Sequence, residues 1–140
     1  MASKNKARGT RWESAIRDWF NAKRLKSYRP AQNGGADLGD VHVDGLVVVQ
    51  AKDAHASRYV EWVADAKQQA SNAGFPFGVV VHKSRNRSIE DARVVMDLGT
   101  FGELVRRLRL AEDFIATTPH VRAAYESVIE DWSGDPLDVP

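Results

Sequence analysis

The chain has 140 residues, 43% hydrophobic and 28% charged, a balance typical of one globular domain. It contains no cysteine, which excludes disulfide scaffolds, thiolate zinc sites and cysteine nucleophiles. The net charge of +1 conceals a gradient, because residues 1–29 carry nine Lys or Arg against two acidic residues, whereas residues 111–140 carry seven Asp or Glu against Arg122. A basic amino-terminal third suits phosphate backbones, which attract cations regardless of base sequence.

The longest apolar run, Leu46 to Val49, is far too short to cross a membrane. The first six residues lack the apolar core of a signal peptide. We therefore expect a cytoplasmic protein without a membrane partner.

In chain order, residues 1–9 are polar and basic and predict a flexible arm. A helical pattern begins at Thr10, with apolar residues recurring at three- and four-residue spacing, and should end near Leu25. Tyr28 to Gln32 predicts a short strand, and Asn33-Gly34-Gly35 predicts a turn.

Two strands, Gly39 to Val43 and Leu46 to Ala51, flank Asp44-Gly45, a dipeptide that strongly indicates a hairpin. After a polar loop, a helix is predicted from about Arg58 to Asn72, and Gly74 closes it.

The run Phe77 to His82 is continuously apolar, which is typical of a central strand covered on both faces. The remaining predicted elements are a strand at Arg93 to Leu98, helices at Phe101 to Leu110 and Pro119 to Trp132, and an acidic tail at residues 133–140. The order of helices and strands predicts an α/β fold, with a mixed sheet flanked by helices in a single domain over residues 10–132.

Three polar side chains converge on one edge of the predicted hairpin. Gln50 and Lys52 share a face because side chains alternate along a strand, and a two-residue turn would place Asp40 opposite position 49, beside Gln50. Carboxylate and amide oxygens can face a hard divalent cation, while a lysine can steady a water or a phosphate oxygen. The trio indicates phosphodiester hydrolysis. Solvation of a strand end would explain Lys52 equally well, but it explains Gln50 less well because that residue follows four apolar ones.

Other side chains could join this site. Glu13 could add a carboxylate from the first helix, although a first-turn Glu is also favoured by the helix dipole. Asp37 is an alternative to Asp40 as the metal ligand, and the expected pairing of residues across the hairpin favours Asp40. His42 shares the face of Asp40, and His55 follows the hairpin where phosphates could pass; both are equally consistent with ordinary strand and loop histidines.

The best candidates for DNA phosphate contacts are cations near Glu13 and at the end of the apolar strand. They are Lys4, Lys6, Arg8, Arg11 and Lys83.

Three short motifs resemble those of the PD-(D/E)xK nuclease superfamily: Gly9-x-x-Trp12-Glu13, Gly39-Asp40-Val41 and Gln50-Ala51-Lys52. The chain is similar in particular to the archaeal-type Holliday junction resolvases and their phage relatives, with Mrr-type restriction nucleases as neighbours. The likeness covers about residues 8–108. It implies a restriction-endonuclease-like α-β-β-β-α-β core, and a metal-dependent, structure-selective DNA endonuclease of a bacterium or phage-infected cell. It also implies a homodimer, since a junction needs two opposed nicks.

The resemblance implies Glu13 and Asp40 as metal carboxylates, Gln50 as a variant third ligand and the backbone carbonyl of Ala51 as a further one. The expected cofactor is Mg²⁺, with Mn²⁺ as a substitute, and Lys52 would orient or help deprotonate the attacking water. Most resolvases carry Glu at the position of Gln50, and a neutral amide holds Mg²⁺ less strongly. Two alternatives therefore stay open: a Mrr-like or repair nuclease acting on other DNA, and a non-catalytic DNA-binding module of the same fold.

Overall fold

A computed structural model describes residues 3–32 and 34–130, and it divides into two compact units, Met1–Asp97 and Leu98–Pro140. The boundary between the units falls inside the single domain expected over residues 10–132. The predicted turn at Asn33 and the acidic tail at residues 133–140 lie outside the described residues. None of the described helices is long and apolar enough to cross a membrane.

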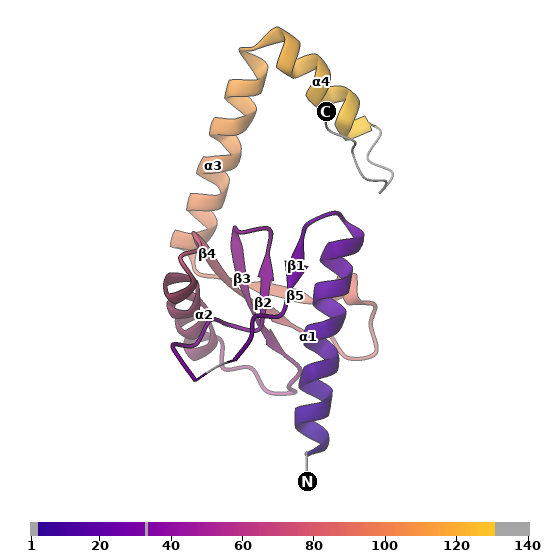
Figure 1. Ribbon diagram of the computed structural model, residues 1–140, viewed down its shortest axis with the longest axis vertical. Coiled ribbons are helices and arrows are strands. Elements are labelled where there is room, and N and C mark those ends of the chain that lie inside the picture. The colour runs from indigo at the N-terminus through magenta and orange to yellow at the C-terminus, as the bar shows by residue number, and fades with distance from the viewer. Residues whose placement is uncertain (1–2, 33, 131–140) are drawn as a thin grey trace. The chain divides into compact units, whose positions relative to one another are not determined.

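The first unit is a five-stranded mixed sheet with a helix on each face (Figure 1). Its elements are α1 (Lys4–Ala22), β1 (Ser27–Tyr28), β2 (Val41–Val43), β3 (Val47–Lys52), α2 (Tyr59–Ala73), β4 (Phe77–His82), a short 3-10 helix η1 (Ile89–Asp91) and β5 (Arg93–Val95). The strands lie in the order β1-β2-β3-β4-β5, and only β3 and β4 run parallel. The predicted mixed α/β fold is confirmed.

Two hydrophobic clusters hold the helices on the sheet. On one face, Trp12 and Ile16 of α1 pack with valines that include Val41 and Val49, and the indole Nε1 of Trp12 donates to the carbonyl oxygen of Val81 at 3.2 Å. On the other face, Trp62 and Ala66 of α2 pack against Val80. All six residues of β4 are buried, which confirms the central strand expected from its apolar run.

Helix α1 begins at Lys4, six residues before the expected start at Thr10, so residues 4–9 are helical and not a flexible arm. The reason is an N-cap at Ser3, whose hydroxyl accepts from the backbone N–H of Lys6 at 3.2 Å. The side chains of the basic residues in this segment therefore point in fixed directions around the helix axis.

The hairpin turn is also one residue longer than expected. Strand pairing joins Val43 to Val47, which leaves a three-residue loop, Asp44-Gly45-Leu46, in place of a two-residue turn. Asp44 and Gly45 both have positive φ, 53° and 69°, which Asp and Gly tolerate better than most residues. The extra residue shifts the pairing register of β2 and β3 by one, so that Val41 pairs with Val49.

The second unit consists of α3 (Leu98–Ala116) and α4 (Pro119–Glu130), which pack against each other. Helix α3 is nearly twice the length predicted from Phe101 to Leu110, and none of its residues is buried. The strand predicted from Arg93 to Leu98 is shorter in the structure, where β5 ends at Val95 and Leu98 begins α3.

Candidate active site

Asp40 lies one residue before β2 and is bonded to the end of β3. The last pair of the β2–β3 ladder joins Val41 to Val49, so Asp40 lies just beyond the paired residues, next to the segment that contains Gln50. The backbone N–H of Asp40 donates to the carbonyl oxygen of Val49 at 3.0 Å, and its Oδ2 accepts from the N–H of Ala51 at 2.8 Å. Asp40 is thus tied to both residues that flank Gln50 in β3.

The carboxylate of Asp40 lies in an environment that disfavours its charged form. Its pKa is raised from 3.8 to about 6, chiefly by burial, with smaller increases from the negative charges of Glu13 and Asp37. The hydrogen bond from the N–H of Ala51 and the charge of Lys52 act in the opposite direction. These four neighbours are therefore close enough to Asp40 to act on its charge.

A cavity of about 490 Å³ lies in front of Asp40. Three carboxylates, Glu13, Asp37 and Asp40, line its wall together with the cations Lys6 and Arg29. Glu13 reaches this wall because its neighbour Trp12 is buried and hydrogen-bonded to the sheet, which fixes the rotation of α1. The expected meeting of Glu13 and Asp40 at one site is thus present in the fold.

Two of these carboxylates already have partners. Glu13 forms an ion pair with Arg29, with its Oε2 2.7 Å from the guanidinium Nη2. Asp37 accepts from the backbone N–H of Gly39 and from Nε2 of Gln69, both at 2.9 Å. Asp37 therefore fastens the turn before β2 to α2, whereas the Oδ2 of Asp40 is held by a single backbone N–H.

Gln50 supplies the unusual acceptor of the site. Its side chain is 6% exposed, and its Oε1 has no hydrogen-bond partner among the described residues. A buried acceptor without a donor costs free energy on the order of 1–3 kcal/mol, so its retention needs a reason. A cation bound between Asp40 and Gln50 would satisfy it.

The remaining donors fit a hard divalent cation. The carbonyl of Ala51 points to the same edge of β3 as its N–H, which is the edge held by Asp40. Oxygen donors of mixed charge are what Mg²⁺ accepts. Among residues 3–32 and 34–130, no three His, Asp or Glu side chains could hold one ion together, so a site here would need the amide and the carbonyl as well as carboxylates.

Lys52 lies at the end of β3, on the same strand face as Gln50. Its Nζ is 5.4 Å from the centre of the Trp62 ring, a cation–π distance that holds the ammonium near the sheet edge. Its backbone carbonyl accepts from the N–H of Lys83 at 2.8 Å, because β3 and β4 are parallel and end together.

The histidines of the sequence prediction take different positions. His42 is buried, with Nε2 2.6 Å from the carbonyl oxygen of Leu38 and its ring against Phe75, so it has a structural role in the core. His55 is exposed in the loop after β3, where no described contact engages it. His82 ends β4 and is held between the Tyr59 hydroxyl and the carbonyl oxygen of Ala54.

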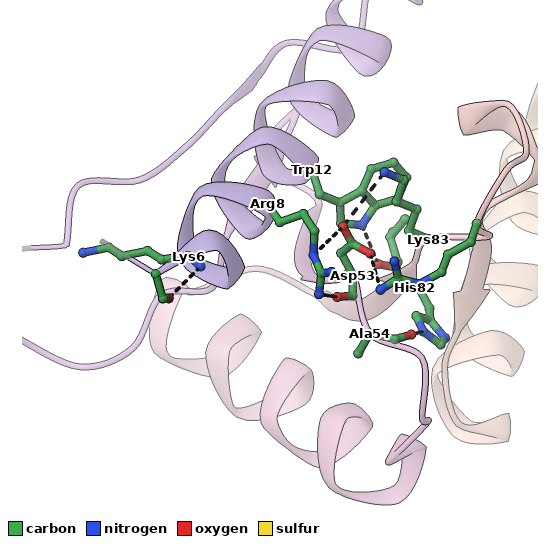
Figure 2. Close-up of polar contacts among 10 residues, drawn as sticks. Lys6, Arg8, Trp12, Asp53, Ala54, His82 and Lys83 are labelled. Atoms are coloured by element: carbon green, nitrogen blue, oxygen red, sulfur yellow. Dashed lines mark hydrogen bonds and ion pairs between the residues drawn. The ribbon is translucent and has the colours of Figure 1, made fainter. Parts of the chain in front are cut away.

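The predicted phosphate contacts separate around α1. Lys4 and Lys6 lie in its first turns, and Lys6 lines the cavity of the carboxylates. Arg8 turns the other way, toward Asp53, and Lys83 approaches the same carboxylate from the end of β4 (Figure 2). Arg11 is exposed on the same side of the helix as Arg8.

Several residues of this region escaped the sequence prediction. Arg29 is the partner of Glu13, Asp53 binds Arg8, and Arg85 and Arg87 follow Lys83 in the loop after β4. The signal for Arg85 and Arg87 was available, since three cations in five residues follow a buried strand. Comparisons with protein-family models, curated proteins and solved structures find no match to this chain.

Proposed function

We propose that the chain is a metal-dependent DNA endonuclease that hydrolyses phosphodiester bonds in branched DNA, with the four-way junction as its preferred substrate. One observation carries the proposal: a desolvated Asp40 is hydrogen-bonded to Ala51 of β3, between Gln50, whose buried Oε1 has no partner among the described residues, and Lys52. A core needs none of these three features, whereas phosphodiester hydrolysis uses all of them.

Asp40, Gln50 Oε1 and the Ala51 carbonyl would hold Mg²⁺ or Mn²⁺, with Glu13 as the second carboxylate. When bound, the ion supplies a water of lowered pKa and neutralises charge on the phosphate. To bind the ion, the Glu13 carboxylate would either leave Arg29 or bind Arg29 and the ion together.

Lys52 has the position for the third role. Its ammonium, anchored over Trp62, would orient the attacking water and stabilise the charge that develops on the phosphate oxygens. Asp40 would have to lose its proton first, so cleavage should increase as the pH rises through about 6.

The order α1-β1-β2-β3-α2-β4 supports the restriction-endonuclease-like core as the finer description of this α/β fold. Paired nicks across a junction would need two such sites, and we therefore propose a homodimer with twofold symmetry.

One observation favours a second candidate, a non-catalytic DNA-binding module. The ion pair of Glu13 with Arg29 and the neutral amide at position 50 leave Asp40 as the only carboxylate of the expected ligand set without a cation partner. A protein that kept the fold and lost the metal would show such a pattern. Cleavage of DNA other than junctions would instead support a Mrr-like or repair nuclease.

The test is incubation of labelled four-way junction, flap and linear duplex with the protein and Mg²⁺ or Mn²⁺. Symmetric paired nicks confined to the junction are expected. Cleavage of the flap or the duplex instead would support the repair alternative, and binding without cleavage under either metal would support the non-catalytic module.

Variants locate the site. Asp40→Asn and Lys52→Met should each lose cleavage by about a hundredfold or more while retaining junction binding in EDTA. Lys67→Met is the matched control, because it removes a lysine whose exposed ion pair with Asp97 contributes little stability. Cleavage that survives in Asp40→Asn would place the chemistry elsewhere.

A further inference from the structure

A second charged centre lies on the opposite flank of α1 from the carboxylates. The side chain of Asp53 is 3% exposed, and three cations from two segments surround it: Arg8 of α1 at 3.6 Å, and Lys83 at 3.9 Å and Arg85 at 3.1 Å from the loop after β4. Figure 2 shows Asp53 with Arg8 and Lys83. One carboxylate against three cations leaves an excess of two positive charges. This excess is unusual around a nearly buried group and invites an anion.

The hydrogen bonds of this centre are incomplete. Arg8 Nε, Arg85 Nε and Arg85 Nη2 are buried and have no acceptor among the described residues, since the ion pairs with Asp53 are too long or poorly directed. Guanidinium groups with unused donors suit a phosphate, whose oxygens accept several N–H bonds at once. Asp53 therefore positions the arginines without saturating them.

A cavity of about 350 Å³ opens beside this centre. Its polar wall consists of Arg8, Arg11, Lys83, Arg87 and Ser88, and no carboxylate is among its lining residues. Within the described part of the chain, neither Arg11 nor Arg87 has an ion-pair partner, and both are exposed. Their charge is thus available to a ligand.

A neighbouring cavity is also lined by arginines, which favours a chain of phosphates over a single small anion as the ligand. A second cavity, of about 480 Å³, is lined by Arg85, Arg87 and Arg93 together with Ser84 and Asp91. Arg87 lines both cavities, and we call the two together the arginine groove. Spaced cations along a groove match the spaced charges of a polyanion.

The position of the groove relative to the carboxylates is set by α1. Lys6 and Glu13 line the carboxylate cavity, whereas Arg8 and Arg11 line the arginine groove, and at 3.6 residues per turn these pairs project to different flanks of the helix. Lys6 accordingly extends away from Arg8 (Figure 2). A helix is about 10 Å wide, which corresponds to about three nucleotides along one strand.

We propose that the arginine groove binds the phosphodiester backbone of a nucleic-acid strand about three nucleotides from the phosphate at Asp40. The spacing of about three nucleotides rests on the proposed nuclease function, but binding of the strand in the groove does not require cleavage. Arg87 and Arg11 provide the free charges, while Asp53 holds Arg8 and Arg85 in place behind them.

The test is fluorescence anisotropy of a labelled thymine oligonucleotide in EDTA, titrated over a range of salt concentrations. Arg11→Gln and Arg87→Gln should each weaken binding about threefold to tenfold and make the salt dependence shallower by about 0.7 per lost contact. Arg17→Gln, on the same helix but outside the groove, is the control and should change neither quantity. Equal affinity and slope in all three variants would overturn the proposal.

Three further outcomes are decisive. If inorganic phosphate raises the melting temperature of the native protein but not of the Arg11→Gln/Arg87→Gln variant, while oligonucleotide binding is unchanged, the site takes a small anion and the strand proposal is wrong. If the arginine variants weaken binding but the native protein cuts no DNA, the groove stands and the nuclease function fails. If the native protein cuts DNA and the arginine variants bind like the control, the nuclease function stands and the groove proposal is wrong.

Discussion

The buried charge of Asp40 should destabilise the metal-free protein, and Asp40→Asn should relieve it. Asn has nearly the shape of a protonated Asp, and its amide oxygen can still accept from the N–H of Ala51. The variant therefore removes the charge without removing the hydrogen bond that Asp40 makes across the hairpin.

The size and sign of the effect follow from the pKa. Burial raises the pKa of Asp40 from 3.8 to about 6, so the folded state binds this proton more tightly than the unfolded state. The contribution of Asp40 to stability is therefore greatest below about pH 4 and is lost as the pH rises through about 6. A difference of about two pH units corresponds to about 3 kcal/mol at pH 7 and above.

The assay is urea unfolding in EDTA, followed by fluorescence of the buried Trp12 and Trp62, at about pH 8 and about pH 4. Asp40→Asn should be more stable than the native protein by about 3 kcal/mol at the higher pH and equal to it at the lower. With a urea dependence of about 1–3 kcal/mol per molar, the midpoint should move by about 1–3 M.

Asp44→Asn is the matched control, because Asp44 is an exposed residue of the same hairpin whose positive φ of 53° Asn also tolerates. Its effect should not change between the two pH values. A stability difference for Asp40→Asn that is independent of pH, or a variant less stable than native at pH 8, would refute the account of a desolvated carboxylate. Added Mg²⁺ should then stabilise the native protein and leave Asp40→Asn unchanged.

Four other substitutions probe the same architecture. Gln50→Glu places a second buried carboxylate beside the first, and urea unfolding in EDTA at about pH 8 should show a loss of about 1–3 kcal/mol that Mn²⁺ restores. Gly78→Ala puts a Cβ against the backbone carbonyl of Ala66 in α2 and should cost more than about 3 kcal/mol, read from the urea midpoint. Gly9→Ala meets open space in α1 and should gain about 0.5–1 kcal/mol in the same assay. Tyr59→Phe leaves Nδ1 of the buried His82 without its donor and should lower thermal stability by about 1–3 kcal/mol.

Local patterns in the sequence are sufficient to predict those elements whose apolar residues show directly which faces must be buried. The apolar run of β4 and the helical spacing of α2 are both found where predicted, since a continuous run requires cover on both faces and a three-to-four spacing requires it on one. The start of α1 was missed although Ser3 was a visible cap, because charge in the segment favoured an arm.

The site was only partly predictable, and the missing part is long-range. Asp40, Gln50 and Lys52 come from one hairpin, so alternation and a turn predict that they lie close together, although the hairpin loop is one residue longer than expected. No local rule pairs Glu13 with Arg29, sixteen residues away, or Arg8 with Asp53, forty-five residues away. These contacts depend on how α1 is rotated on the sheet, which the packing of buried side chains decides.

The two flanks of α1 carry opposite charge imbalances, and this links the two proposals. On one side Asp40 is held near carboxylates that raise its pKa, and on the other Asp53 is outnumbered by cations. A divalent cation would relieve the first flank, and a phosphate backbone would relieve the second. Because α1 lies between the two centres, a strand bound in the arginine groove would bring the neighbouring phosphate, with its negative charge, toward Asp40. That charge would strengthen cation binding there, so metal and DNA should each raise the affinity of the other, a coupling that Lys52→Met should leave in place and Asp40→Asn should remove.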